Sequence, residues 1–196
     1  MSALTECSAE PLGPEFPYAD QWFAQFTLTR IFKTEFSRET VTSTFAVMRR
    51  AYSAMRSFDD GLSGVKAFLS ERKIGAYFQA LGAFEASLSS AYQGLVFAGK
   101  YIGEKLFDKG DSSELERMNR VYNVSRHYDP AKDLLPDHLH AVWLRNEGLH
   151  TGADALTFEE IRKWNHVLCK ISDHMAKGEK PVHPYGRCSE RCAPRR

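Results

Sequence analysis

The stretch "YFQALGAFEASLSSAYQGLVFAGK", residues 77–100, decides the fold class because its apolar positions recur at intervals of three and four. This spacing is typical of a helix that packs along its whole length in a bundle. One position in the apolar series is Glu85, and a carboxylate there needs a cationic or donor partner on a facing helix unless it reaches solvent at the bundle end. The series, followed slightly beyond the quoted stretch, comprises Leu81, Glu85, Leu88, Tyr92, Leu95, Gly99, Ile102 and Leu106.

The rest of the chain also reads as helical, with few of the alternating β-branched runs that indicate strands. We therefore expect an all-α protein, an up-and-down bundle in which Ser37 caps the second helix and Thr157 with Glu160 forms a capping box at the last. The Asp and Gly residues of "SFDDGLSG", residues 57–64, are expected to end one helix and start another. The expected helices cover 20–36, 38–56, 63–107, 112–127, 136–151 and 158–176, and the third breaks near Gly75.

Length and charge indicate one domain with two tails. The 196 residues, 43% of them hydrophobic, suffice for one core, which we place at 20–176. Residues 1–19 contain acids but no Lys or Arg, which predicts a solvated acidic tail, and 177–196 form a basic tail that contains cysteines. The net charge of +1 excludes a histone-type nucleic-acid wrapper, so any contact with nucleic acid must be focal.

Several classes of protein have no support in the sequence. No apolar run reaches the length of a bilayer span and the N-terminus lacks the build of a signal peptide, which predicts a cytoplasmic protein with no membrane partner. The motifs of P-loop ATPases, zinc proteases and serine hydrolases are absent. In "HPYGRCSERC", His183, Cys188 and Cys192 are three soft ligands where a structural zinc site needs four, so we expect incidental cysteines, no metal and no cofactor.

The stretch "HAVWLRNEGLHTG", residues 140–152, is the candidate functional motif because polar residues interrupt an apolar run. On a helix, Asn146 and His150 are one turn apart and share the apolar stripe, whereas Arg145 lies on its flank. An Arg and a His at this separation arise by chance in such a chain, so the spacing alone has little weight. The distinguishing feature is the apolar stripe around them, which we expect to comprise Leu139, Val142, Trp143, Asn146, Leu149 and His150.

The segment "RNEGLH", residues 145–150, resembles the Arg-polar-x3-His signature of the HEPN superfamily (higher eukaryotes and prokaryotes nucleotide-binding), whose members are helical bundles and often metal-independent ribonucleases. The resemblance covers about residues 75–176, where a long helix precedes the motif helix as in that superfamily, and it makes the earlier helices N-terminal additions. It implies that Arg145 and His150 form a catalytic pair supported by Asn146, and that two protomers of a homodimer complete one site.

The same resemblance implies RNA as the substrate, a role in defence, toxicity or stress response, and an antitoxin or regulatory protein as a further partner. Gly152 stands where members paired with a nucleotidyltransferase antitoxin often carry Tyr, so the resemblance does not extend to that particular antitoxin.

The residue types suit metal-independent cleavage of single-stranded RNA by attack of the ribose 2′-hydroxyl. His150 would move the proton, since imidazole titrates near neutral pH, and Arg145 would stabilise charge on the phosphate oxygens. Glu85 is expected to support the site as the partner of a cation. Arg126 and His127 are weaker candidates for binding RNA phosphates.

A second interpretation stays open from the sequence. Asn146 and His150 could hydrogen-bond each other inside the bundle while Arg145 forms an ion pair with Glu85 on its flank. The protein would then be a non-catalytic HEPN-like module for interaction or nucleotide binding. A position of His150 inside one protomer, away from any cleft, would favour this interpretation.

Overall fold

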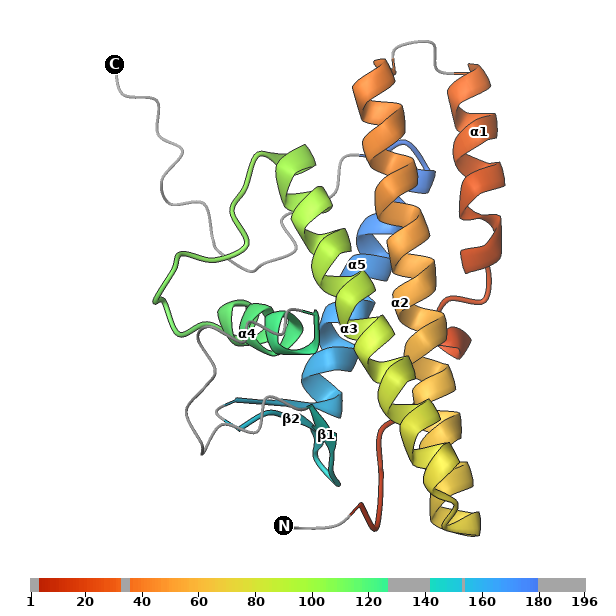
Figure 1. Ribbon diagram of the computed structural model, residues 1–196. Helices are drawn as coiled ribbons and strands as arrows, with labels where there is room; N and C mark the ends of the chain where they lie inside the picture. Colours follow the sequence, from red (N-terminus) through yellow and green to blue (C-terminus); the bar gives the residue numbers. More distant parts are fainter. Residues whose placement is uncertain (1–3, 33–35, 127–141, 153, 180–196) are drawn as a thin grey trace.

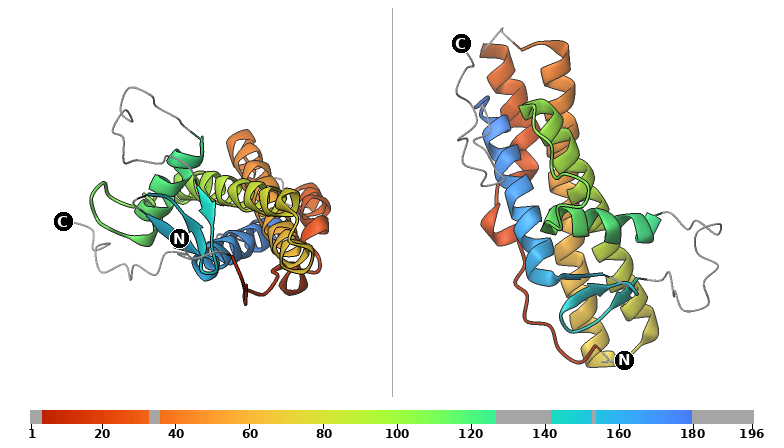
Figure 2. Two further views of the ribbon diagram at one scale, coloured as in Figure 1. Left: turned by 60° about the horizontal axis from the view of Figure 1, so that its bottom comes forward. Right: turned by 90° about the vertical axis from the view of Figure 1, so that its left-hand side faces the viewer.

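The computed structural model describes residues 4–32, 36–126, 142–152 and 154–179, and most of them lie in helices (Figure 1). Three long helices, α2 (Arg38–Glu71), α3 (Ile74–Ile102) and α5 (Phe158–Ala176), pack against one another. The shorter α1 (Trp22–Phe32) lies on α5 and α2, and α4 (Glu114–Arg126) runs across the long helices (Figure 2). The helical class expected from the sequence is therefore confirmed for most of the described chain.

The two longest helices form a hairpin whose turn differs from the expected one. α2 continues through "SFDDGLSG" to Glu71, and the chain reverses at Arg72, which adopts the left-handed conformation with φ 53°. Gly61 lies inside α2 and faces the ring of Phe84, which a Cβ at this position would approach to 2.9 Å. The predicted boundary at 57–64 is wrong because this glycine serves close helix packing and not a turn; the break predicted near Gly75 falls slightly earlier.

Local capping signals determine where two of the helices begin. Ser37 caps α2, since its hydroxyl accepts a hydrogen bond from the backbone N–H of Thr40 at 3.1 Å. At α5, Thr157 and Glu160 form both hydrogen bonds of a capping box. Both predictions are confirmed, and they show that these helix starts depend on residues within one turn.

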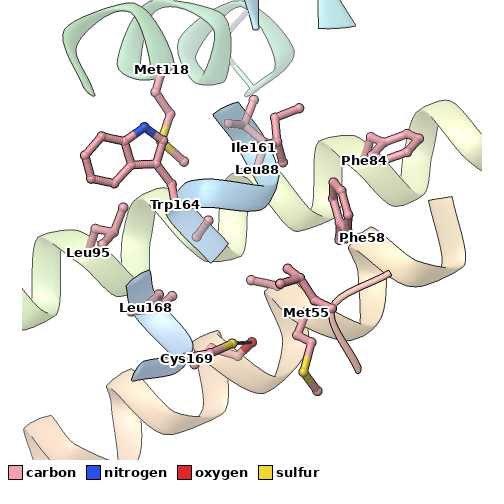
Figure 3. Packing of buried hydrophobic residues seen from close by; sticks show 14 of the residues in the cluster. Met55, Phe58, Phe84, Leu88, Leu95, Met118, Ile161, Trp164, Leu168 and Cys169 are labelled. Carbon is pink, nitrogen blue, oxygen red and sulfur yellow. Dashed lines mark hydrogen bonds between the residues drawn. The ribbon is translucent and has the colours of Figure 1, made fainter. Parts of the chain in front are cut away.

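The core fills the space between α2, α3 and α5, and α4 closes one side of it (Figure 3). Phe58 of α2 meets Phe84 of α3 edge to face, with ring centroids 5.6 Å apart. Trp164 of α5 is buried near Met118 of α4, as Figure 3 shows. Burial of each large apolar side chain stabilises the fold by about 1.5–3 kcal/mol, so this shared core holds the four helices together.

A small antiparallel sheet follows α4 at one end of the bundle (Figure 1). Its strands β1 (Trp143–Leu144), β2 (Gly148–His150) and β3 (Ala155–Thr157) pair in the order β1-β2-β3. The helix predicted over 136–151 is therefore wrong for residues 142–151, and the chain is not all-α; residues 136–141 lie outside the described part.

Tertiary contacts account for the choice of strand over helix. Leu144 and Leu149 face each other across the β1–β2 pair, and both are buried together with Leu156 of β3. The hydroxyl of Tyr77 accepts a hydrogen bond from the backbone N–H of Leu144 and donates one to its carbonyl, which satisfies the outer edge of β1. Apolar residues in this segment thus meet partners from α3 and β3 that a local pattern does not reveal.

The N-terminal residues are not the solvated tail that the sequence predicts. Leu4 and Leu12 are buried, and the carboxylate of Asp59 on α2 accepts hydrogen bonds from the backbone N–H groups of Leu12 and Gly13 at 2.7 and 2.8 Å. Two short 3-10 helices, η1 (Gly13–Glu15) and η2 (Ala19–Gln21), then lead into α1. Burial of the apolar side chains that lie between the acidic residues, such as Leu4 and Leu12, holds this segment against the bundle. Across the described residues, no helix is both long and apolar enough to cross a membrane.

Candidate functional site

The motif "RNEGLH" forms a β-hairpin with a two-residue turn. The N–H of Arg145 donates to the carbonyl of Gly148 at 2.9 Å, and the N–H of Gly148 donates back to Arg145 at 3.3 Å. Asn146 and Glu147 are therefore the turn residues, while His150 lies further along β2 opposite Trp143. The helical stripe expected to unite Asn146 with His150 does not exist.

Gly148 is required where β2 approaches β3. Its φ is +153°, and a Cβ at this position would overlap the carbonyl oxygen of Leu156 and lie 2.8 Å from the Cα of Thr157. Only a residue without a side chain permits this approach. The close approach of β3 thus explains why the motif has glycine at position 148, independently of any catalytic role.

The side chain of Asn146 holds the N-terminal segment. Its Oδ1 accepts hydrogen bonds from the backbone N–H groups of Thr5 at 2.6 Å and Glu6 at 3.3 Å, and its Nδ2 donates to the Thr5 hydroxyl at 2.9 Å. Among the described residues no hydrogen bond joins Asn146 to His150. The amide of Asn146 is thus committed to another segment of the chain, and its support of a catalytic pair stays a prediction.

His150 is largely enclosed, with 20% of its side chain exposed. Its Nε2 is buried and has no hydrogen-bond partner among the described residues; the nearest carboxylate oxygen, Oε2 of Glu147, is 3.5 Å away. Burial lowers the pKa of His150, and the charge of Arg145 lowers it further, against an opposing effect of Glu147. Burial thus favours the neutral form of the imidazole, and Arg145 lies close enough to act on it electrostatically.

A cavity of about 880 Å³ adjoins the turn of the hairpin. Asn146 and Glu147 line it, but His150 does not. Four of its lining residues are acids and one, Arg162, is a cation, whose guanidinium is bonded to the carbonyl of Glu10 and to the carboxylate of Glu15. The acidic lining disfavours a polyanion such as RNA beside the motif. The acids are Glu6, Glu10, Glu147 and Glu159.

Two other candidate residues lie together elsewhere, between α3 and α4. Burial raises the pKa of Glu85, and the charge of Arg126 acts against this increase. Nη2 of Arg126 donates to the hydroxyl of Ser89 at 2.7 Å, one turn along α3 from Glu85. The cation that the sequence requires near Glu85 is thus Arg126 and not Arg145. His127 lies outside the described residues.

The same face contains polar residues that the sequence analysis did not identify. Arg50 of α2 donates from Nε and Nη2 to Oε1 of Gln93 on α3, at 3.1 and 2.9 Å. Nε2 of Gln93 donates to the hydroxyls of Ser89 and of Tyr122 on α4, both at 3.3 Å. A signal was present, since Ser89 and Gln93 are polar residues one turn apart on a helix that is otherwise largely apolar. We call Arg50, Ser89, Gln93, Tyr122 and Arg126 together the α2–α3–α4 polar cluster.

Metal ligands and known relatives add no further assignment. Among the described residues, no group of three or more His, Cys, Asp or Glu side chains is placed to hold a metal ion. His183, Cys188 and Cys192 lie outside those residues. A comparison of the chain with protein-family models, curated proteins and solved structures finds no match.

Proposed function

We propose that the protein is a non-catalytic helical interaction module whose partner is a second copy of the same chain. The observation that carries this proposal is the outer face of α1, where three large apolar side chains are exposed. Leu28 is 58% exposed, Ile31 64% and Phe32 83%. Their spacing places them on one stripe of the helix, and contiguous exposed apolar surface is typical of interaction sites.

The opposite face of α1 explains why the stripe is available. Trp22 and Phe26 are buried against the bundle, so α1 is held firmly while its other side points away from α2 and α5 (Figure 2). α1 contains a single charged residue, Arg30. Two copies related by a two-fold axis can therefore pack these stripes together with little charge repulsion.

The position of the motif supports a module without catalysis. The amide of Asn146 is used to hold the N-terminal segment, and Nε2 of His150 is buried inside one protomer. The cavity next to the turn is acidic and does not include His150. The enclosure of His150 is what the second interpretation drawn from the sequence required, although the Asn146–His150 bond and the Arg145–Glu85 pair of that interpretation are absent from the described residues.

Sedimentation equilibrium over a range of concentrations tests the self-association. We expect the wild type to form a dimer and Ile31→Ser/Phe32→Ser to remain monomeric, with circular dichroism showing that the helices are retained. The matched control is Ile74→Ser/Phe78→Ser, which removes two side chains that are 65% and 57% exposed at the start of α3. A wild type that stays monomeric at every concentration, or dimers that survive the α1 substitutions, would overturn the proposal.

A second candidate function is metal-independent endoribonuclease activity of the HEPN type at Arg145 and His150. The lowered pKa of His150, on which the charge of Arg145 acts, favours it, because an imidazole and a guanidinium in one hairpin suit proton transfer at a phosphodiester. Incubation with labelled single-stranded RNA in EDTA distinguishes the two functions. Cleavage that is lost in both Arg145→Ala and His150→Ala, and kept in the control Arg120→Ala, would establish the ribonuclease; an absence of cleavage by the wild type supports the interaction module.

A further inference from the structure

We propose that the α2–α3–α4 polar cluster is a binding site for a phosphorylated ligand, with Arg50 donating to the phosphate oxygens and Arg126 adding a second positive charge. This site is separate from α1, from the hairpin and from the acidic cavity, so it does not depend on the function proposed above.

The first observation is that the Arg50 guanidinium is half-buried among neutral groups. It donates to the amide oxygen of Gln93, and its Cζ lies 4.6 Å from the centre of the Phe97 ring. Within the described residues no carboxylate lies within ion-pair distance of Arg50. A partly desolvated cation is normally paired with an acid, so an anionic partner would complete the interactions of this guanidinium.

The second observation is that neighbouring side chains hold the guanidinium in one orientation. Gln93 donates to Ser89 and Tyr122 through Nε2, which directs its Oε1 towards Arg50. Gly94 allows the backbone of α3 to approach α2 closely, since a Cβ there would lie 3.2 Å from the Cβ of Arg50. The donor is thus positioned before a ligand binds, which reduces the entropy lost on binding.

The third observation is the accumulation of positive charge around this network. Nη2 of Arg126 donates to Ser89, whose side chain is 2% exposed and which also contacts Gln93. The charge of Arg49 acts on Arg50, and together with burial it lowers the Arg50 pKa. Arg126 in turn acts on the nearby Glu85, and burial raises the pKa of that carboxyl and so disfavours its charged form.

The chemistry of guanidinium favours a phosphoryl group as the ligand. It carries five N–H donors in a planar fork that matches two oxygens of a phosphate, and Gln93 uses only two of the nitrogen atoms of Arg50. A phosphoryl dianion also neutralises more of the accumulated charge than a carboxylate. The stacked rings of Tyr92 and Tyr122, with centroids 4.8 Å apart, border the network and add an aromatic surface beside it.

Binding of inorganic pyrophosphate, measured by calorimetry and by NMR at constant ionic strength, tests the proposal. We expect chemical-shift changes at the Gln93 side-chain amide and at Arg50 Nε, and binding at least about tenfold weaker in Arg50→Met and Arg126→Met. Methionine preserves most of the apolar stem, and Arg50→Lys gives a second variant that keeps the charge but loses the fork. The control is Arg120→Met on α4, whose arginine is paired with Asp154 and lies outside the cluster.

The outcomes separate three possibilities. Binding that falls in both Arg50→Met and Arg126→Met but persists in Arg120→Met supports the site, and a loss in Arg50→Lys as large as that in Arg50→Met supports recognition by the fork. Equal binding of pyrophosphate and acetate would show that any anion suffices and would overturn the assignment to phosphate. A wild type that binds no pyrophosphate at about 1 mM, or variants that bind it unchanged, would overturn the site itself.

Discussion

Nε2 of His150 on β2 lies 3.5 Å from Oε2 of Glu147, a residue of the tight turn that joins β1 to β2. Both residues belong to the motif that the sequence marks as functional, yet the imidazole nitrogen is buried and the neighbouring cavity is lined by acids. The motif is therefore first of all a structural unit, which joins the sheet to the N-terminal segment.

The stability of the protein is expected to depend on pH through His150. Burial lowers the pKa of His150 and of His166, so each binds fewer protons in the folded chain than in the unfolded chain. The free energy of unfolding is then highest above the unfolded value of about 6.5 and falls as the pH drops through it towards the lower folded value. Urea unfolding between about pH 7.5 and pH 5.5 should show this loss, and His150→Gln should reduce it. An unchanged pH dependence in that variant would contradict the prediction.

The substitution Asn146→Ala should release the N-terminal segment from the hairpin. It removes the acceptor of the Thr5 and Glu6 N–H groups and the donor to the Thr5 hydroxyl, at a cost of about 1–2 kcal/mol in the free energy of unfolding. Faster hydrogen exchange at Thr5 and Glu6 would accompany this loss. The control Asn123→Ala removes only an exposed bond to Asn119 and should change stability little. Equal effects of the two substitutions would count against the role of Asn146.

The substitution Gly148→Ala should destabilise the sheet. A Cβ there overlaps the carbonyl oxygen of Leu156, and the positive φ is strained for alanine, so we expect a loss of about 2 kcal/mol or more. In contrast, Gly82→Ala in the middle of α3 places its Cβ where no atom lies within 4 Å. Alanine also favours helix by about 0.5–1 kcal/mol, so this control should stabilise the protein. Thermal unfolding of both variants checks the opposite signs.

The two adjacent aspartates of α2 should differ in their effects on stability. Asp59 accepts hydrogen bonds from the N–H groups of Leu12 and Gly13, and hydrogen bonds to a charged group contribute about 1.5–3 kcal/mol. Asp59→Ala should therefore lower the free energy of unfolding by about 2 kcal/mol and expose the N-terminal segment to proteolysis. Asp60 is exposed, so Asp60→Ala is the matched control and should have almost no effect. Similar losses in both variants would contradict the proposed anchor.

The thiol of Cys169 should resist alkylation in the folded protein. It is fully buried against the carbonyl of Ala51, and burial raises its pKa, so little reactive thiolate forms (Figure 3). Mass spectrometry after iodoacetamide treatment should find Cys169 unmodified in the native protein and modified in urea. Cys7 is only partly buried and should react first of the two. Rapid modification of Cys169 without denaturant would show that the core opens locally.

Local signals in the sequence predicted those parts of the fold that depend on neighbouring residues. The Ser37 cap and the capping box of Thr157 and Glu160 each involve hydrogen bonds within one turn of helix, and both are present. The periodicity of residues 77–100 likewise predicted α3 through most of its length. The same reasoning failed at residues 57–64, because a glycine that serves helix packing and a glycine that ends a helix look alike in a sequence.

The sequence identified individual residues of the candidate site, but it did not predict how these residues are arranged in space. Arg145, Asn146 and His150 were identified as a group, and they do lie in one hairpin, although Asn146 is turned to Thr5 and Glu6. Glu85 and Arg126 were identified separately, and Arg126 is bonded to Ser89, one turn along α3 from Glu85. Arg126 is connected to Arg50 through hydrogen bonds of Ser89 and Gln93, and these side chains come from three helices. Spacing within one segment of the sequence cannot predict such a connection.

By itself, the sequence determined the helical class, the capped starts of α2 and α5 and the long amphipathic helix α3, because these depend on interactions between residues a few positions apart. Only the tertiary structure decided that the short strands β1, β2 and β3 form a sheet, since the apolar residues of β1 and β2 are buried by β3 and α3, and Gly148 allows β3 to approach. It also decided that Arg50, Gln93 and Arg126 join one network, because packing of α2, α3 and α4 brings together side chains that are far apart in the chain.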